Sequence, residues 1–325
     1  MSMMIPTDPA DGDLAFANEL GVTHVYTWVP PERSSVAGLT ALRQRVEAAG
    51  LTLFNVGHGT LAKSDKIHLA LPGRDAAIAE FGEFLHHLGA AGIHTTTFTF
   101  EPDGVWSTAP AAARGGAPTR AVDAAQLAAQ APRHGRSYTE AESWDNFAYF
   151  MERIIPVAEA AGVRLALHPN DPPVPEIAGV PCIIRSWEAY DRAFQIGDSD
   201  NLGMEFCTGC WLEGGVNGFG DVQAAIPDFV ARGKVFIVHF RNVSSALPKF
   251  HETFVDEGYQ NMNVLMRLFH DSGYGGTMIL DHTPLMAQVR QPDAALFGHF
   301  DKVATAYAIG YMKALRAVAA DQSGA

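Results

Sequence analysis

The amino-acid sequence predicts an α/β fold, a single (β/α)8 TIM barrel with a long lid-like insertion after the fourth strand. Short apolar runs alternate with helical segments along the 325 residues, which is typical of a parallel sheet covered by helices. Eight such runs can be assigned, and eight parallel strands close this type of barrel. Because the sequence shows neither an internal repeat nor a domain boundary, we expect residues 1–325 to form one domain.

The expected strands are short runs rich in β-branched, aromatic and other apolar residues. In chain order they are Met3–Ile5, Val22–Val29, Leu51–Val56, His94–Phe100, Arg164–His168, Leu202–Cys207, Val235–Arg241 and Thr277–Asp281.

The expected helices lie between these strands and repeat apolar residues every three or four positions. Ile78, Phe81 and Leu85 form one such stripe. The segments are Arg74–Ala91, Ser143–Ala161, Ser186–Ile196, Asp221–Ala231 and Asn263–Asp271, and a last helix at about Ala295–Ala319 is expected to pack across the barrel.

One long segment, about 101–136, interrupts the alternation and is rich in Ala, Gly and Pro. It follows the fourth strand, on the rim where barrel enzymes carry their chemistry. A loop of this length in a compact fold is ordinarily a functional lid or a disordered segment. We interpret it as a lid that carries Trp106 and Arg120, and the alternative is an insertion without function.

The composition narrows the compartment and the partners. A net charge of −13 argues against a nucleic-acid partner, which requires a basic face. The three cysteines are too few and too irregularly spaced for a disulfide framework, which indicates a reducing compartment. The amino-terminal segment lacks the pattern of a secretory signal, and no run approaches the roughly 18 apolar residues of a membrane span. We therefore expect a cytoplasmic protein with no membrane partner.

Four short apolar runs within the expected strands, RLALH, LGMEFC, VFIVH and TMILD, close on a potential metal ligand: His168, Cys207, His239 and Asp281. The carboxyl ends of barrel strands converge at one rim, so we expect the four side chains to meet there. Two imidazoles, a thiolate and a carboxylate suit Mn²⁺, Fe²⁺, Co²⁺ or Zn²⁺. Taken singly, each His could be a hydrogen-bonded core residue and the Cys a small hydrophobe. Their common position on consecutive strands favours a metal site.

The cysteines allow other interpretations that have less support. Cys207 and Cys210 form a CxxC motif, but a zinc ribbon needs a second pair and the sequence has none. We interpret Cys210 as a neighbour of the metal site and Cys182 as a core residue.

Further polar residues follow the same strands. Asn170 and Asp171 come after His168 in a proline-rich turn. Arg241 stands two residues after His239, which places it on the same strand face and allows it to clamp a substrate carboxylate; the alternative is a salt bridge at the barrel rim. His282 follows Asp281 and suits general acid or base work, or alternatively a hydrogen bond that supports the ligands.

Six short motifs carry a family resemblance when they are taken together. They are IHLALPGRD at 67–75, LALHPNDPP at 165–173, FCTG at 206–209, HFRNV at 239–243, KFHE at 249–252 and LDH at 280–282. In combination they resemble the mannonate dehydratase family, a branch of the xylose-isomerase-like barrels, from about Leu51 to Leu315.

The resemblance implies an enzyme that dehydrates D-mannonate to 2-keto-3-deoxy-D-gluconate through a metal-stabilised enediolate, usually with Mn²⁺ or Fe²⁺. It implies His168, Cys207, His239 and Asp281 as metal ligands and His282 with Arg241 as catalytic residues. The partner would be a small-molecule sugar acid, with a homodimer suggested by analogy. The residues expected to contact the substrate are Asn170, Asp171, Asn242, His251 and Arg120.

The sequence departs from the family pattern at three places. Asn170 replaces an Asp, and Thr283 starts a stretch that lacks the basic residue usual after Asp-His. Phe297 stands where the family has a catalytic Tyr, and a phenyl ring cannot transfer a proton. His299, His251 or Tyr259 could take that part. Two alternatives therefore stay open: a metal-dependent sugar isomerase or epimerase of the same superfamily, and a non-catalytic sugar-acid binder.

Overall fold

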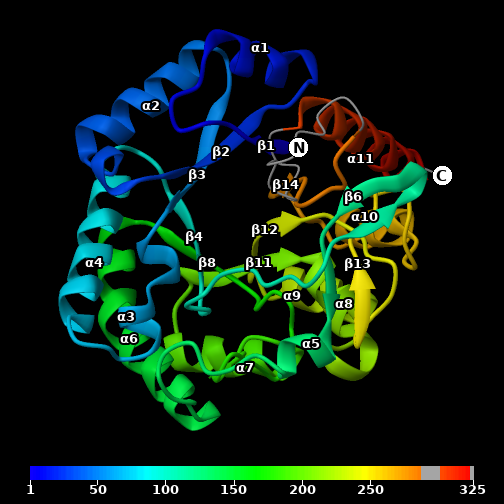
Figure 1. The fold of residues 1–325 in the computed structure, drawn as a ribbon. Helices are drawn as coiled ribbons and strands as arrows, with labels where there is room; N and C mark the ends of the chain where they lie inside the picture. The colour runs from blue at the N-terminus through cyan, green and yellow to red at the C-terminus, as the bar shows by residue number, and fades with distance from the viewer. Residues whose placement is uncertain (287–300, 323–325) are drawn as a thin grey trace.

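A parallel barrel sheet surrounded by helices forms the centre of the protein in the computed structural model, which describes residues 1–286 and 301–322 (Figure 1). The eight strands follow one another in the order β3-β2-β1-β14-β12-β11-β8-β4. They are β1 (Ser2–Met4), β2 (His24–Val29), β3 (Thr52–His58), β4 (Thr95–Thr99), β8 (Arg164–His168), β11 (Leu202–Cys207), β12 (Val235–His239) and β14 (Thr277–Ile279). The predicted barrel is confirmed.

Side chains join the two ends of this strand order. Thr96 Oγ1 on β4 donates to the carbonyl oxygen of Val56 on β3 over 2.8 Å. Asn55 Nδ2 on β3 donates to Thr97 Oγ1 on β4 over 2.9 Å. Both bonds are buried, where a hydrogen bond is shielded from competing water. The polar residues of β3 and β4 therefore connect the strands at which the barrel closes.

Two strands, β12 and β14, end two residues earlier than the sequence pattern predicted. The expected strand ends were Arg241 and Asp281, but β12 ends at His239 and β14 at Ile279. The last backbone contact between these strands is the Phe240 N–H, which donates to the Ile279 carbonyl oxygen over 3.0 Å. The Arg241 N–H donates instead to Thr208 Oγ1, over 3.0 Å. Arg241 therefore lies in the loop after β12 and does not share a strand face with His239.

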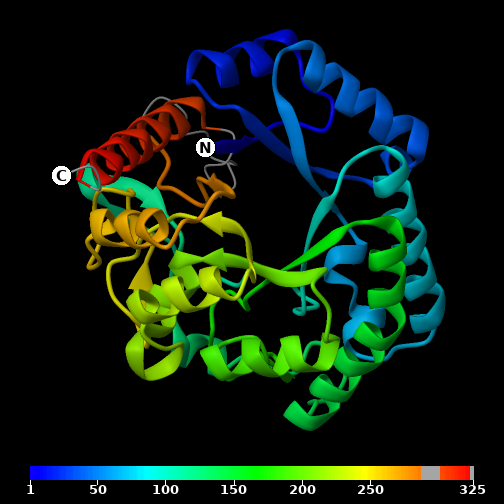
Figure 2. The same cartoon turned by 180° about the vertical axis from the view of Figure 1, so that it is seen from behind.

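The helices cover the outside of the sheet (Figures 1 and 2). The longer ones are α1 (Asp11–Glu19), α2 (Val36–Ala48), α4 (Arg74–Ala90), α6 (Glu140–Ala161), α7 (Trp187–Gly197), α8 (Thr208–Gly218), α9 (Val222–Ala231), α10 (Met262–Asp271) and α11 (Lys302–Gln322). The short ones are α3 (Asp65–His68), α5 (Ala124–Ala128), η1 (Pro31–Arg33), η2 (Leu61–Lys63) and η3 (Arg114–Gly116).

Local sequence signals explain where α6 begins and ends. Thr139 and Glu142 form a capping box, in which each side chain accepts a hydrogen bond from the backbone N–H of the other residue. Gly162 ends the helix in the left-handed conformation, with φ of 64°. The apolar face of α6 packs against α4, where the Phe81 and Phe150 rings meet edge to face at 5.6 Å. This packing buries the stripes that predicted both helices.

The last helix, α11 (Lys302–Gln322), overlaps its predicted range but packs in the outer ring of helices instead of across the barrel. The predicted range began at about Ala295, and residues 287–300 are outside the described part of the chain. The described helix α11 continues to Gln322 and lies beside α10 in the outer ring (Figure 2). Lys302 forms an ion pair with Asp13 of α1, at 3.0 Å. α11 therefore fills a place in the helical ring and does not cross the barrel.

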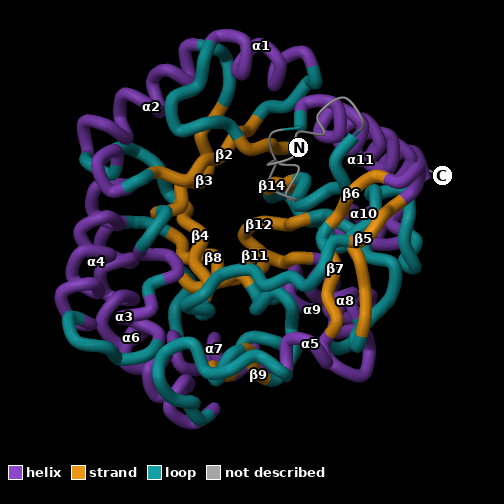
Figure 3. The backbone as a smooth tube through the Cα atoms, viewed as in Figure 1, coloured by secondary structure: helices purple, strands orange, loops and turns teal. Residues whose placement is uncertain are grey.

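The segment 101–136 has secondary structure of its own (Figure 3). β5 (Ala111–Ala113) and β6 (Ala117–Thr119) form an antiparallel hairpin. β7 (Ala121–Asp123) pairs antiparallel with β13 (Lys249–His251). A further two-stranded pair, β9 (Glu176–Ile177) and β10 (Val180–Pro181), lies in the segment after β8. The β7–β13 pairing fixes the insertion against the segment that follows β12.

None of the described helices combines the length and the apolar character that a membrane span requires.

Candidate metal centre

Four side chains meet at the carboxyl ends of neighbouring strands. His168, Cys207 and His239 are the last residues of β8, β11 and β12, and Asp281 stands two residues after β14. The strand order places β14, β12, β11 and β8 side by side. Each residue brings one potential ligand atom into a group whose atoms all lie within 4.8 Å of one another. The four residues that the sequence singled out are therefore adjacent in space, and we call them the ligand quartet.

The two histidines of the ligand quartet are arranged as metal ligands would be. His168 Nδ1 lies 2.7 Å from the Pro169 carbonyl oxygen. If Nδ1 carries the proton of that hydrogen bond, Nε2 is left to bind a cation. His239 Nδ1 and Nε2 are both buried, and their described neighbours are carboxylates, with Nδ1 3.3 Å from Asp281 Oδ2 and Nε2 2.7 Å from Glu205 Oε1. Neither contact among the described residues has the geometry of a hydrogen bond. Buried polar atoms ordinarily have partners, so the residues present fit a bound cation.

The Cys207 sulfur is suited to be a thiolate. Its Sγ lies 3.5 Å from Asp281 Oδ2 and accepts the backbone N–H of Cys210 over 3.5 Å. Burial alone would raise the pKa of the Cys207 thiol, but the hydrogen bond with the Cys210 side chain and the charge of Arg241 outweigh it and bring the pKa well below its usual range. A thiolate is the form of cysteine that binds metals.

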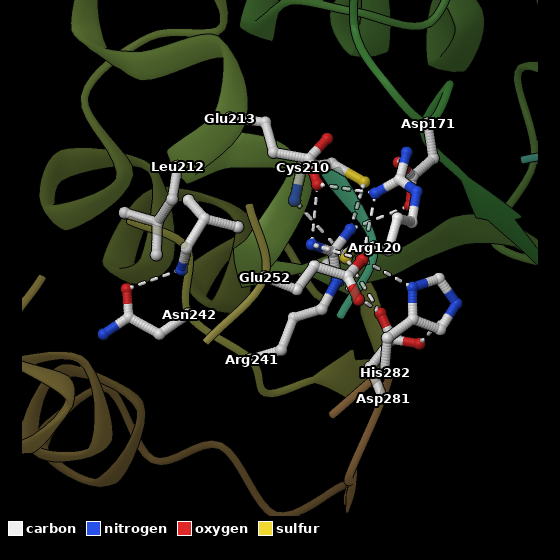
Figure 4. Close-up of polar contacts among 12 residues, drawn as sticks. Arg120, Asp171, Cys210, Leu212, Glu213, Arg241, Asn242, Glu252, Asp281 and His282 are labelled. Atoms are coloured by element: carbon white, nitrogen blue, oxygen red, sulfur yellow. Dashed lines mark hydrogen bonds and ion pairs between the residues drawn. The ribbon is translucent and has the colours of Figure 1, made fainter. Parts of the chain in front are cut away.

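Arg241 lies among carboxylates instead of facing open space (Figure 4). Its Nε donates to Asp281 Oδ2 over 2.7 Å, Nη1 to Glu213 Oε1 over 2.6 Å, and Nη2 to Asp171 Oδ2 over 2.8 Å. The side chain is 1% exposed. These contacts use all three guanidinium nitrogens, so the geometry favours a buried ion pair over the expected substrate clamp.

Arg120 reaches the same carboxylates from the insertion. Its Nη2 donates to Asp171 Oδ1 over 2.6 Å and its Nη1 to Glu252 Oε1 over 2.9 Å. Burial would raise the pKa of Asp171, but Arg120 and Arg241 bring it well below its usual range. Asp171 therefore stays ionised between the two guanidinium groups, and the insertion is tied to the rim by a fully buried charge.

A second group of potential ligands is occupied by an arginine. Asp171, Cys210 and Glu213 each bring an atom within 4.8 Å of the others. Arg241 donates to all three residues, including Cys210 Sγ at 3.4 Å. The guanidinium group takes the place that a cation would occupy, so we assign no metal to this group.

His282 is paired with a carboxylate that the sequence analysis did not assign. His282 Nδ1 lies 2.8 Å from Glu252 Oε1, which also accepts from Arg120. Burial would raise the pKa of Glu252, but the charge on His282 and the hydrogen bond between them lower it. The signal for Glu252 in the sequence is its place in the KFHE motif, directly after His251.

A cavity of about 460 Å³ opens at the ligand quartet. This volume lies within the roughly 300–1,000 Å³ typical of small-molecule sites. Beside His168, His239, Asp281 and His282, its wall contains Met4, Tyr26, Trp28, Asn55, Gly59, Lys63, Thr97, Thr99, Val105, Asp171 and Glu205. A larger hollow of about 760 Å³ lies at the opposite end, lined by the first residues of several strands and by none of the ligand quartet.

Several residues predicted to bind substrate face other partners. Asn170 Nδ2 donates to the Phe100 carbonyl oxygen over 3.3 Å, and its Oδ1 accepts the Ile184 N–H over 2.7 Å. Asn242 Nδ2 donates to the Gln260 carbonyl oxygen over 2.8 Å and lies apart from the ion pairs (Figure 4). Both amides bind backbone, so they brace loops. These two residues, His251 and Arg120 are not among the residues of the cavity wall.

The structure does not describe every residue that could replace the catalytic tyrosine of the family. Phe297 and His299 lie outside the described residues. Tyr259 donates its hydroxyl to the Leu212 carbonyl oxygen over 2.6 Å, so this hydroxyl is bound to the backbone of α8. The identity of a substitute for the family tyrosine stays a prediction.

Glu205 is the residue of the cavity wall that sequence reasoning could have found. It is a charged residue in the apolar run LGMEFC, two positions before Cys207. Strand alternation places both residues on the same face. Glu213 gave no comparable signal, because its helix α8 was not predicted from the glycine-rich segment after Cys207.

Comparison with known proteins gives consistent matches along the chain. A sequence model of the D-mannonate dehydratase (UxuA) family matches residues 130–322. Mannonate dehydratase 2 of Halalkalibacterium halodurans is 27% identical over 272 residues, which cover 75% of this chain and 77% of that protein. The mannonate dehydratase of Streptococcus agalactiae is 29% identical over 289 residues, covering 80% and 81%. The crystal structure of mannonate dehydratase from Streptococcus suis superposes with a TM-score of 0.86 at 26% identity, covering 100% of this chain and 94% of that one.

Proposed function

This chain belongs to the D-mannonate dehydratase (UxuA) family, and on that premise we propose that it is a metal-dependent hydro-lyase that converts D-mannonate to a 2-keto-3-deoxy sugar acid. The observation that carries the proposal is the ligand quartet at the cavity, whose ligand atoms lie within 4.8 Å of one another. The net reaction removes a proton from the carbon next to the carboxylate and a hydroxyl group from the following carbon.

We assign the metal to His168, Cys207, His239 and Asp281. A bound divalent ion would act as a Lewis acid and as a template for a hydroxyl-bearing substrate. Mn²⁺ and Fe²⁺ are the first candidates, because imidazole and carboxylate ligands with an oxygen-rich substrate suit them. The Cys207 thiolate would also accept Co²⁺ or Zn²⁺.

We assign proton exchange with the substrate to His282, which is in the cavity wall. Its Nδ1 contacts Glu252 Oε1 at 2.8 Å. Its Nε2 lies 3.5 Å from Asp281 Oδ1, and we assign the proton exchange with the substrate to this nitrogen. A histidine held in one orientation by a carboxylate is a common arrangement for general acid–base catalysis. Arg120 in turn holds Glu252, which makes Arg120 a positioning residue in this scheme.

We assign recognition of the substrate carboxylate to Lys63. Arg241 lies within ion-pair distance of four protein carboxylates, so it does not offer a free face to an anion. Lys63 lies in η2, and among the described residues of the cavity wall it is the one with a Lys or Arg side chain. Its Nζ lies 3.5 Å from Glu101 Oε1, so its present contact is a single ion pair. A lysine ammonium can bind a second carboxylate through its remaining N–H groups.

The direct test is product formation. Purified protein is freed of metal, loaded with Mn²⁺ or Fe²⁺, and incubated with D-mannonate, with D-gluconate as the C2 epimer for comparison. We expect a 2-keto-3-deoxy product from D-mannonate that depends on the metal and disappears in His168→Ala. Interconversion of sugars without loss of water would instead support the isomerase or epimerase. Tight ligand binding without any conversion would support the binder.

A further inference from the structure

Glu205 is a buried carboxylate in the cavity wall that has few partners of its own. The residue is 1% exposed and stands in the middle of β11. Its Oε1 lies 2.7 Å from His239 Nε2. Its Oε2 is buried and has no hydrogen-bond partner among the described residues. An ionised carboxylate offers about four acceptor sites, and leaving them unfilled in the interior is costly.

The contact with His239 tells which side of that ring faces the ligand quartet. His239 Nδ1 lies 3.3 Å from Asp281 Oδ2, whereas Nε2 faces Glu205. Nδ1 is therefore the nitrogen on the side of the proposed metal. A histidine that binds a metal usually donates its other N–H to a carboxylate, which fixes the tautomer and the ring orientation. Glu205 stands where such a carboxylate is needed.

Other atoms of the cavity wall share the unfilled hydrogen-bonding capacity of Glu205. Asn55 Oδ1 on β3 and Thr99 Oγ1 on β4 are likewise buried without a partner among the described residues. Both residues are part of the wall of the same cavity. Three unsatisfied polar groups from three strands are poorly suited to an apolar ligand, and they fit a ligand that carries several hydroxyl groups.

The charge of Glu205 also restricts how such a ligand can lie. A carboxylate accepts hydrogen bonds from hydroxyl groups and repels another carboxylate. The acidic end of a sugar acid is therefore expected near Lys63, which follows β3, and its hydroxyl-bearing carbons near Glu205 on β11. β3 and β11 are not neighbours in the strand order. The two charges are therefore expected to fix the orientation of a sugar acid in the cavity.

We propose that Glu205 has two parts: it positions His239 for the metal, and it accepts a hydrogen bond from a hydroxyl group of the bound sugar acid, which makes it a specificity-determining residue. The second part rests on the proposed function, and the first part does not.

Two substitutions separate these parts. Glu205→Ala removes both, whereas Glu205→Gln keeps one acceptor oxygen for His239 and replaces the other with an N–H donor. We expect Glu205→Ala to weaken Mn²⁺ binding about 10- to 100-fold, the range seen when a partner of a metal-bound histidine is removed. We expect Glu205→Gln to stay within about threefold of the parent protein in Mn²⁺ affinity. Equal Mn²⁺ affinity in Glu205→Ala and the parent, measured by equilibrium dialysis against a chelator, would overturn the positioning part.

The hydroxyl contact is tested by measuring KM for D-mannonate and for its mono-deoxy analogues. We expect Glu205→Gln, measured at saturating Mn²⁺, to raise KM for D-mannonate by about tenfold or more, the range for losing a charged hydrogen bond. For one mono-deoxy analogue of D-mannonate, Glu205→Gln should have the same KM as the parent protein, because the hydroxyl group that this analogue lacks is the one that Glu205 binds. An unchanged KM, or an equal further loss with every analogue, would overturn the contact.

Control measurements keep these results independent of folding and of the proposed function. Glu188→Gln removes a carboxylate from the exposed first turn of α7 and should change neither Mn²⁺ affinity nor KM. Glu205→Asp keeps the charge and should restore part of the Mn²⁺ affinity if Glu205→Ala is unstable. If the parent protein binds Mn²⁺ but neither converts nor binds D-mannonate, the proposed function fails while the Mn²⁺ measurements still decide the positioning part.

Discussion

Arg241 Nε donates to Asp281 Oδ2 over 2.7 Å, so a single carboxylate belongs both to the ligand quartet and to the buried ion pairs. Asp281 Oδ2 also lies 3.5 Å from Cys207 Sγ and 3.3 Å from His239 Nδ1. Burial would raise the pKa of Asp281, but His282, His239 and Arg241 bring it well below its usual range. The position of this ligand therefore depends on an arginine that we do not expect to touch the metal.

Replacing Arg241 should destabilise the protein and weaken its metal site together. Arg241→Gln leaves Asp171, Glu213 and Asp281 buried without their shared cation, and breaking a buried ion pair costs about 3–5 kcal/mol. Urea unfolding of the metal-free protein measures this loss, and elemental analysis measures the bound metal.

Arg232 is a matched control for this experiment, because it also pairs with two carboxylates. Arg232 contacts Asp191 and Asp228, but its side chain is 36% exposed. Pairs near the surface contribute about 0–1 kcal/mol, so Arg232→Gln should have little effect. Equal losses for the two variants would contradict the special position of Arg241.

Metal binding and turnover should separate between Asp281 and its neighbour in sequence. Asp281→Ala removes a member of the ligand quartet, so we expect the purified variant to lose its metal. His282→Ala removes a residue of the cavity wall that is outside the quartet, so we expect it to keep the metal and lose turnover by about 10²- to 10⁴-fold. Elemental analysis and product assays on the same samples check both. Full activity in His282→Ala would show that another group exchanges the proton.

The ligand quartet was predictable because it depends on two local patterns and one topological rule. Apolar runs predicted where β8 and β11 end and that His239 closes the apolar part of β12, and the parallel barrel brings strand ends together. The neighbourhood of Arg241 was not predictable in this way. Its carboxylates come from the turn after β8, from the unpredicted helix α8 and from beyond β14. Arg120 arrives from the insertion, and no local pattern encodes such distant pairings. Glu205 was predictable in part, because strand alternation places it on the same strand face as Cys207.

Substrate recognition should depend on Lys63 and not on its neighbour Lys66. Lys63→Met removes the lysine of the cavity wall, so we expect KM for D-mannonate to rise about 10- to 100-fold while the bound metal stays unchanged. Lys63→Arg should recover part of the loss because it restores the charge. Lys66→Met changes an exposed residue of α3 and should leave KM as it is. If Lys63→Met has the KM of the parent protein, the substrate carboxylate is bound elsewhere.

Acid should destabilise the protein partly through His68. This ring is buried against Phe100, with ring centroids 4.3 Å apart. Burial, assisted by the charge of Lys63, lowers the pKa of His68 from 6.5 to about 3. Between these two values the unfolded chain binds a proton at His68 that the folded protein does not bind. The free energy of unfolding therefore falls as the pH falls from about 6.5 towards about 3, with a slope of up to about 1.4 kcal/mol per pH unit from this residue.

Urea unfolding of the metal-free protein across this range should show a shallower slope for His68→Gln. His86→Gln, at an exposed position of α4, should keep the slope of the parent protein, and an unchanged slope in His68→Gln would exclude this residue as the cause.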